Sequence, residues 1–317
     1  MNLNNIEKVA VIGAGIMGEG IAQGFAQAGL AVKVFAHHQE SLNRCFEQIE
    51  ANLSLFTEFN LLQEKPASIL SRIQLCIAGD INRDVRDCQF IVESIPEILE
   101  KKRELFDQLD LCPPEVILSS NTSSYTISTI TEGMNTSERV VGLHYFMPAQ
   151  IIPLVEIHRG KNTSDEAVEV TRRLMLKIGK KPILVRKEIP GFIVNRISAC
   201  MGREIHYLIE QGVVTAEDFD MAAKASYGFR LASLGPVSQM DISGLDTIVG
   251  ASKGMYTSLC NSTEVSQMLV DMVNRGDKGL KTGKGFYDWT GRSRKQVIEE
   301  MNKNLLKELV LFKERES

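Results

Sequence analysis

Short hydrophobic runs alternate with amphipathic stretches along the first 190 residues of the chain. The runs are rich in β-branched residues, which predicts β-strands, and most of the intervening stretches have the spacing of helices. The predicted strands are KVAVIG (8–13), AVKVFA (31–36), RIQLCIA (72–78), CQFIVES (88–94), EVILSSN (115–121), ERVVGLHYF (138–146), PLVEIH (153–158) and KKPILVR (180–186). This alternation predicts a Rossmann-type, doubly wound α/β domain: a parallel sheet with helices on both faces.

The pattern changes after the last predicted strand, where the segment Lys187 to Gly191 interrupts it. Beyond this point the hydrophobic spacing is almost entirely helical, as in residues 192–212 and in a further stretch that uses Thr215 as its N-cap. We therefore predict a dinucleotide-binding domain over residues 1–188 and an all-helical domain over residues 189–317. The charged tail after Arg292 is predicted to be a solvated helix.

A glycine loop follows the first predicted strand and opens a helix. Gly13, Gly15 and Gly18 have the G-x-G-x-x-G spacing of a loop that binds a dinucleotide pyrophosphate. The first glycine allows a tight turn, the second lets the backbone approach the pyrophosphate, and the third lets the helix pack closely on the strand. Ile16 and Met17 begin the helix, whose free N–H groups attract an anion, so they complete the predicted cofactor-binding loop.

The end of the second strand lacks the acidic residue that usually binds the adenosine ribose about 20 residues after the loop. Ala36 occupies that position and is followed by His37 and His38. The histidines, with Arg44, are candidates to face a 2′-phosphate, or they belong to a solvated loop. The predicted cofactor is therefore NAD, with NADP left open.

Composition narrows the class of protein. The net charge of −4 argues against a nucleic-acid partner, and no apolar stretch approaches the ~20 residues that cross a bilayer. The chain runs directly into a strand, which favours a cytoplasmic location. Six cysteines without a C-x-x-C pair predict reduced thiols, and we expect no metal-ligand cluster.

His144 and Glu156 both lie in hydrophobic runs, where a titratable group needs a partner or a purpose. Around them the sequence resembles the L-3-hydroxyacyl-CoA dehydrogenase family over nearly the whole chain. The resemblance rests on GAGIMGEGIA, VESIPEILEKKRELF, SSNTSSYTI, GLHYFMP, PLVEI, IPGFIVNRI, GLD and KTGKGFYDW. It implies an NAD(P)-dependent dehydrogenase with a small-molecule substrate, in a homodimer whose helical domain closes over that substrate.

The resemblance also implies roles for individual residues. His144 matches the family's base, which accepts the proton left by hydride transfer, and Glu156 matches the carboxylate that orients it. Ser120 and Asn195 match two polar residues that hold the reacting oxygen. Each of these two could instead cap or brace a helix.

Three further residues are expected beside the cofactor. Glu97 and Lys102 match residues near the nicotinamide half, and Asn121, the last residue of the fifth predicted strand, is expected to bind the cofactor as well. An exposed pair such as Glu97 and Lys102 could also simply be solvated.

Three departures from the family pattern concern the substrate. Met147 stands where family members that act on acyl-CoA commonly have asparagine, and Glu58 stands where a lysine near a helix tip would meet CoA phosphates. Arg230, in YGFRLASLGP, is similar to the branch that oxidises small hydroxy acids, and its planar guanidinium is suited to grip a carboxylate. An interface salt bridge is the alternative role for Arg230.

The leading hypothesis is oxidation of the 3-hydroxyl of a short-chain L-3-hydroxyacyl-CoA. A dehydrogenase of a small free hydroxy acid, or of a hydroxymethyl or aldehyde carboxylate, is the close alternative. A non-catalytic nucleotide-binding protein of the same fold is the third, because fold does not guarantee activity.

Overall fold

The computed structural model describes residues 6–316 and divides them into two compact units. The first unit comprises the chain up to Ile193 together with Asn302–Val310. The second comprises Val194–Met301 and the residues from Leu311 onward.

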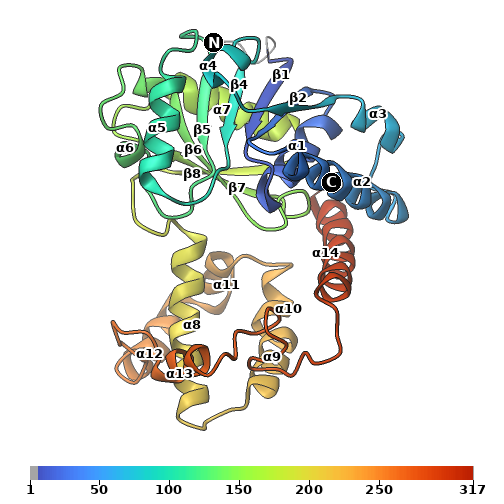
Figure 1. Cartoon of the computed structure of the whole chain (residues 1–317). Helices are drawn as coiled ribbons and strands as arrows, with labels where there is room; N and C mark the ends of the chain where they lie inside the picture. The colour runs from blue at the N-terminus through green and yellow to red at the C-terminus, as the bar shows by residue number, and fades with distance from the viewer. Residues whose placement is uncertain (1–5, 317) are drawn as a thin grey trace. The chain divides into compact units, whose positions relative to one another are not determined.

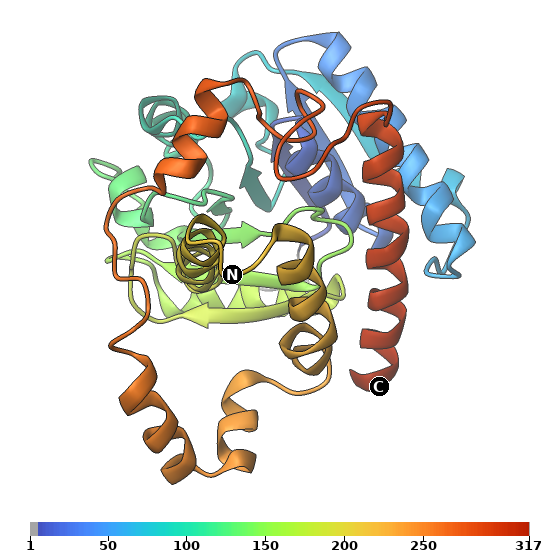
Figure 2. The same ribbon diagram turned by 90° about the horizontal axis from the view of Figure 1, so that it is seen from below.

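The first unit is built on one eight-stranded sheet in the order β3-β2-β1-β4-β5-β6-β7-β8. All eight predicted strands are present: β1 Lys8–Ile12, β2 Ala31–Ala36, β3 Ile73–Ile77, β4 Phe90–Glu93, β5 Ile117–Ser120, β6 Val140–Tyr145, β7 Leu154–Arg159 and β8 Lys181–Val185. The Rossmann-type architecture is confirmed, with one departure from an all-parallel sheet. Strand β7 runs antiparallel to β6, because only residues 146–153 join them and no helical crossover intervenes. These late strands lie side by side in green to yellow-green in Figure 2.

Helices cover both faces of this sheet (Figure 1). The helices of the first unit are α1 Ile16–Gln27, α2 Gln39–Glu58, α3 Pro66–Leu70, α4 Ile81–Asp84, α5 Leu99–Leu109, α6 Ile127–Ile130 and α7 Asp165–Lys177, with a 3-10 turn at Ser137–Arg139. Strand residues alternate between two hydrophobic clusters. Val9 and Val11 pack with α1, α2, α3 and α7, whereas Ala10 and Ile12 pack with α4, α5 and α6. This period-two division is the expected pattern for a sheet buried on both faces.

The second unit is helical throughout its described secondary structure. Its helices are α8 Val194–Glu210, α9 Ala216–Ala225, α10 Tyr227–Leu231, α11 Pro236–Ser243, α12 Leu245–Met255, α13 Gln267–Asn274 and part of α14 Arg294–Glu316. The Thr215 hydroxyl accepts a hydrogen bond from the Asp218 N–H, so the predicted N-cap is confirmed.

The prediction of a solvated C-terminal helix is wrong for the middle of α14. Leu306 and Leu309 are buried and pack with Phe56 of α2 and with Ile151, which follows β6. The high charge of the tail obscured an apolar stripe with a spacing of three residues, which lies on one side of a helix. Residues Asn302–Val310 therefore belong to the sheet-containing unit.

Candidate active site

The glycine loop between β1 and α1 has the geometry that a dinucleotide requires. Gly13 has a φ of +120°, and a Cβ on Gly18 would lie 1.8 Å from the Gly13 carbonyl oxygen. A Cβ on Gly15, by contrast, would meet no atom within 4 Å. Gly13 and Gly18 therefore make the tight turn and the close packing, and Gly15 leaves open space beside exposed Ile16 at the helix N-terminus.

The end of β2 shows no carboxylate. Ala36 is partly buried, and both His37 and His38 are exposed at the start of α2. The Arg44 guanidinium donates to the Ser41 hydroxyl at 3.3 Å. The imidazoles and Arg44 are thus within an exposed segment, and their contact with an adenosine ribose stays a prediction.

A buried ion pair lies where β4 ends. The Lys102 ammonium is 2.6 Å from Glu93 Oε1 and 3.2 Å from Glu97 Oε2, and the Lys102 side chain is only 1% exposed. The interpretation of Lys102 as part of a solvated helix pair is therefore wrong. Since both of its ionic contacts are to carboxylates of its own chain, Lys102 holds the β4–α5 connection together.

Ser120 belongs to the same closed network. It is fully buried at the end of β5, its hydroxyl donates to Glu93 Oε2 at 2.5 Å, and it accepts from the Thr122 N–H at 3.2 Å. A hydroxyl has one proton to donate, so Ser120 has none left for a substrate oxygen. The prediction that Ser120 holds the reacting oxygen therefore conflicts with its hydrogen bonds.

The loop after Ser120 offers a different hydroxyl. Ser123 and Ser124 are exposed, and their N–H groups donate to Glu97 Oε1 at 3.1 and 3.0 Å. Burial by itself would raise the pKa of Glu97, but hydrogen bonds from Thr122 and the charge of Lys102 together lower it. Sequence reasoning missed Ser123, although it lies three residues from Ser120 in the same SSNTSS motif.

Asn121 lies in this loop and braces the next strand. Its side-chain carbonyl accepts from the Tyr145 N–H at 2.9 Å, and its amide donates to the Ser94 hydroxyl at 3.4 Å. Asn121 thus joins the ends of β4, β5 and β6, and the carboxyl ends of such strands are where doubly wound sheets bind ligands.

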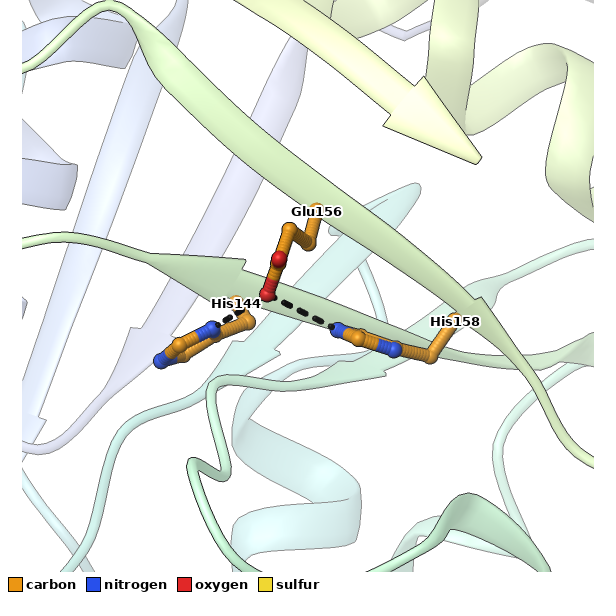
Figure 3. A group of neighbouring side chains, drawn as sticks. All are labelled: His144, Glu156 and His158. Carbon is orange, nitrogen blue, oxygen red and sulfur yellow. Dashed lines mark hydrogen bonds and ion pairs between the residues drawn. The ribbon is translucent and has the colours of Figure 1, made fainter. Parts of the chain in front are cut away.

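His144 and Glu156 face each other across the antiparallel pair β6–β7 (Figure 3). The distance between His144 Nδ1 and Glu156 Oε2 is 2.9 Å, and Glu156 is fully buried. The other carboxylate oxygen, Oε1, accepts from the Ile193 N–H at 3.2 Å. Among residues 6–316, no hydrogen bond is made by His144 Nε2. Glu156 therefore fixes the orientation of the His144 ring through Nδ1, and Nε2 is left without a hydrogen bond. A general base needs this arrangement.

A second buried histidine lies beside this pair. His158 Nε2 is 3.7 Å from Glu156 Oε2, and the His158 ring lies on the Phe192 ring with a centroid distance of 3.6 Å. Burial lowers the pKa of His158 to about 4, against the opposing charge of Glu156, so this imidazole is neutral at pH 7. Sequence reasoning missed His158, although the P-L-V-E-I-H run places it two residues after Glu156 and so on the same face of β7.

The remaining predicted residues lie outside this cluster. Met147 follows β6 and is 63% exposed. Asn195 is the second residue of α8, and Arg230 is exposed on α10, so both belong to the second unit. Their roles toward the substrate stay predictions.

Two family models match consecutive parts of the chain. The model described as 3-hydroxyacyl-CoA dehydrogenase, NAD binding domain, matches residues 8–189, and the C-terminal domain of the same family matches residues 191–289. A probable 3-hydroxybutyryl-CoA dehydrogenase of Deinococcus radiodurans is 36% identical over 284 residues, which cover 89% of this chain and 100% of that protein. The prediction of NAD as cofactor is confirmed by the family match.

Two solved structures differ in how fully they match. An NAD⁺-dependent 5-formyl-3-hydroxy-2-methylpyridine 4-carboxylic acid 5-dehydrogenase is 27% identical with a TM-score of 0.89, covering 97% of this chain and 99% of that one. An (S)-3-hydroxybutyryl-CoA dehydrogenase from Ralstonia eutropha is 31% identical with a TM-score of 0.73, covering 90% of this chain and 100% of that one.

Among the described residues, no helix has the length and apolarity needed to span a bilayer.

Proposed function

Because the chain belongs to the 3-hydroxyacyl-CoA dehydrogenase family, we propose that it is an NAD-dependent dehydrogenase whose substrate is a small hydroxy acid with a free carboxylate. The observation that carries this choice is the position of α14 on the end of α2. Family members that act on acyl-CoA use that helix end for CoA phosphates, according to the resemblance described above.

In this chain the end of α2 is covered by apolar contacts. Leu306 and Leu309 pack on Phe56, and Leu55, Phe59, Leu61 and Leu62 lie around them. Glu58, the last residue of α2, has an ion pair with Lys303 of α14 at 3.8 Å. A surface built from leucines and a paired carboxylate offers little to phosphates, which bind best to unpaired cations. The C-terminal family model ends at residue 289, so α14 lies beyond it.

The extent of the structural matches supports the same choice. The pyridine carboxylate dehydrogenase matches almost the whole chain, with the higher TM-score, whereas the 3-hydroxybutyryl-CoA dehydrogenase leaves about a tenth of this chain without a counterpart. Arg230 would then bind the substrate carboxylate through its two-pronged donor face.

The chemistry follows from the His144–Glu156 pair. Glu156 accepts a hydrogen bond from Nδ1–H, which leaves Nε2 with a free lone pair that can take the hydroxyl proton of the substrate. The resulting imidazolium is stabilised by the buried carboxylate beside it. When the dinucleotide is bound with its pyrophosphate on the glycine loop, its nicotinamide supplies the hydride acceptor. The exposed hydroxyl of Ser123 is our candidate to hold the reacting oxygen in place of Ser120.

A short-chain L-3-hydroxyacyl-CoA is the second candidate substrate. It is favoured by the 36% identity with the probable 3-hydroxybutyryl-CoA dehydrogenase, which exceeds the identity with the pyridine carboxylate enzyme. The acid–base chemistry would be the same for both substrates.

The test compares thioester with free acid. Oxidation of NADH by the purified protein is measured with acetoacetyl-CoA, with acetoacetate, and with hydroxy and aldehyde carboxylates run in both directions. The proposal expects saturable turnover of free acids only, and an increase in KM of at least ~10-fold in Arg230→Met that Arg230→Lys partly restores. Turnover of the thioester alone would assign the chain to the acyl-CoA enzymes. NADH binding without any turnover would support the non-catalytic alternative.

We also propose that the chain forms a homodimer through its second unit. Within the described chain, helices α8 to α13 bury none of their residues. Large apolar side chains there are highly exposed, among them Phe229 at 77%, Ile242 at 72% and Tyr256 at 70%. Apolar surface of this extent indicates a protein partner. Light scattering after size-exclusion chromatography should give twice the chain mass, and a monomer at micromolar concentration would contradict the dimer.

A further inference from the structure

Two buried histidines flank one buried carboxylate in the sheet of the first unit (Figure 3). Glu156 Oε2 is 2.9 Å from His144 Nδ1 and 3.7 Å from His158 Nε2. One candidate ligand atom from each of the three residues can be chosen so that all lie within 4.8 Å of one another. The sequence suggested no metal-ligand cluster, because this one forms only when β7 turns back along β6.

Strand register explains the convergence. Glu156 pairs directly with His144, and His158 pairs with Gly142 two positions away, so all three side chains lie on one face of the β6–β7 pair. A Cβ on Gly142 would lie 2.7 Å from His158 Cβ. The glycine therefore leaves the space in which the His158 ring lies beside Glu156.

The buried imidazole of His158 lacks hydrogen-bond partners. Its side chain is 3% exposed, and among the described residues neither ring nitrogen has a hydrogen-bond partner. Its packing contact is the Phe192 ring, which satisfies no polar atom. Buried polar atoms without partners are rare because each costs free energy, and such atoms often mark a ligand or ion.

We propose that His144, Glu156 and His158 form a binding site for a divalent transition-metal cation, Zn²⁺ above all. Two imidazoles and one carboxylate are a ligand set that Zn²⁺ uses with a water in the fourth position. Bonds of roughly 2.0–2.2 Å in a tetrahedron separate ligand atoms by about 3.4 Å. The distances of 2.9 and 3.7 Å to Glu156 Oε2 lie on either side of that value, and all three ligand atoms lie within 4.8 Å of one another, so side-chain movements must bring them to one common distance around the cation.

Occupancy of this site would inhibit the dehydrogenase, a consequence that rests on the proposed role of His144. The cation takes the Nδ1 lone pair, so the single proton of the neutral imidazole moves through solvent from Nδ1 to Nε2, with no net release of a proton. A protonated Nε2 cannot accept the substrate proton. The metal thus competes with the hydrogen bond to Glu156 and acts as a reversible inhibitor.

Binding is tested first, without substrate. Metal-free full-length protein is titrated with Zn²⁺ by calorimetry and with Co²⁺ by visible absorption. We expect one equivalent at this site, with an affinity at least ~10-fold lower in both His158→Leu and His158→Gln, whose folding is checked by circular dichroism. His37→Asn, which removes an exposed histidine, and Cys200→Ser are matched controls and should keep wild-type affinity. Unchanged affinity in both His158 variants would overturn the site.

Inhibition is tested second, with whichever substrate the protein turns over. Micromolar Zn²⁺ should slow the wild type and EDTA should restore it, while each His158 variant should lose at least ~10-fold of its sensitivity relative to its own metal-free rate. Binding without inhibition would overturn the inhibitory role. Failure to find any substrate would count against the proposed function, and the titrations would still decide the metal site.

Discussion

Two clusters of titratable side chains lie in the sheet, one where β4 and β5 end and one on the pair β6–β7, and they differ in whether each polar atom has a hydrogen-bond partner. In the first, Glu93 receives hydrogen bonds from both Lys102 and Ser120, and Lys102 also reaches Glu97. In the second, Glu156 holds His144, whose Nε2 has no partner among residues 6–316, and His158 beside it has none for either nitrogen.

This difference in hydrogen bonding distinguishes a cluster that stabilises the fold from one that can exchange a proton. A network in which every donor has an acceptor can only hold its elements together, because a substrate would have to break a bond to enter it. A network with an open nitrogen on an oriented ring can exchange a proton. Both clusters contain residues that resemble catalytic groups in sequence, and hydrogen-bond completeness is what distinguishes them.

The largest effect on stability is expected when the ion pair between Lys102 and Glu93 is removed. Lys102→Met leaves Glu93 buried without its cation and should lower the free energy of unfolding by about 3–5 kcal/mol. Denaturant unfolding measures it, with Lys101→Met as the exposed neighbour that should change stability by less than ~0.5 kcal/mol. A stable Lys102→Met protein with weakened NADH binding would instead make Lys102 a cofactor ligand.

The two serines of the SSNTSS motif give the next contrast. Ser120→Ala removes a hydrogen bond to a buried carboxylate and should cost about 1.5–3 kcal/mol of stability. Ser123→Ala should leave unfolding unchanged and lower kcat by roughly 10- to 100-fold, because it removes a donor to the reacting oxygen. If Ser123→Ala had full activity, the exposed hydroxyl would have no catalytic part.

A third charge belongs to neither cluster, and its effect should be the smallest. Among residues 6–316, no ion pair or hydrogen bond is made by the Glu19 carboxylate, and burial raises its pKa from 4.5 to about 7. The folded state therefore keeps a proton that the unfolded chain loses between pH 4.5 and 7, so stability falls as pH rises through that window. Glu19→Gln should add about 1 kcal/mol at pH 8, after a discount for screening, and nothing at pH 4. An equal change at both pH values would contradict the titration of Glu19.

The hydrophobic pattern predicted the strands and the glycine loop, because both depend on residues that are close in sequence. Whether every polar atom of a buried cluster has a hydrogen-bond partner could not be predicted from the sequence in this way. Ser120 and Ser123 differ in role because β5 ends at Ser120 inside the sheet, and Lys102 is buried because α5 packs against β4. His158 lies beside Glu156 and His144 because β7 runs antiparallel to β6 in this register. The middle of α14 is buried because it packs on α2. These contacts join residues that are far apart in the sequence, so the local spacing of hydrophobic residues could not predict them.

The central claim is that the open pair of His144 and Glu156 is the reacting centre. The most direct test is single-turnover hydride transfer in His144→Gln, with NADH binding and thermal unfolding measured on the same preparation. We expect a rate at least ~100-fold below wild type, with cofactor affinity and unfolding temperature nearly unchanged. A rate within a few-fold of wild type would show that the proton goes elsewhere, and the assignment of this cluster would be wrong.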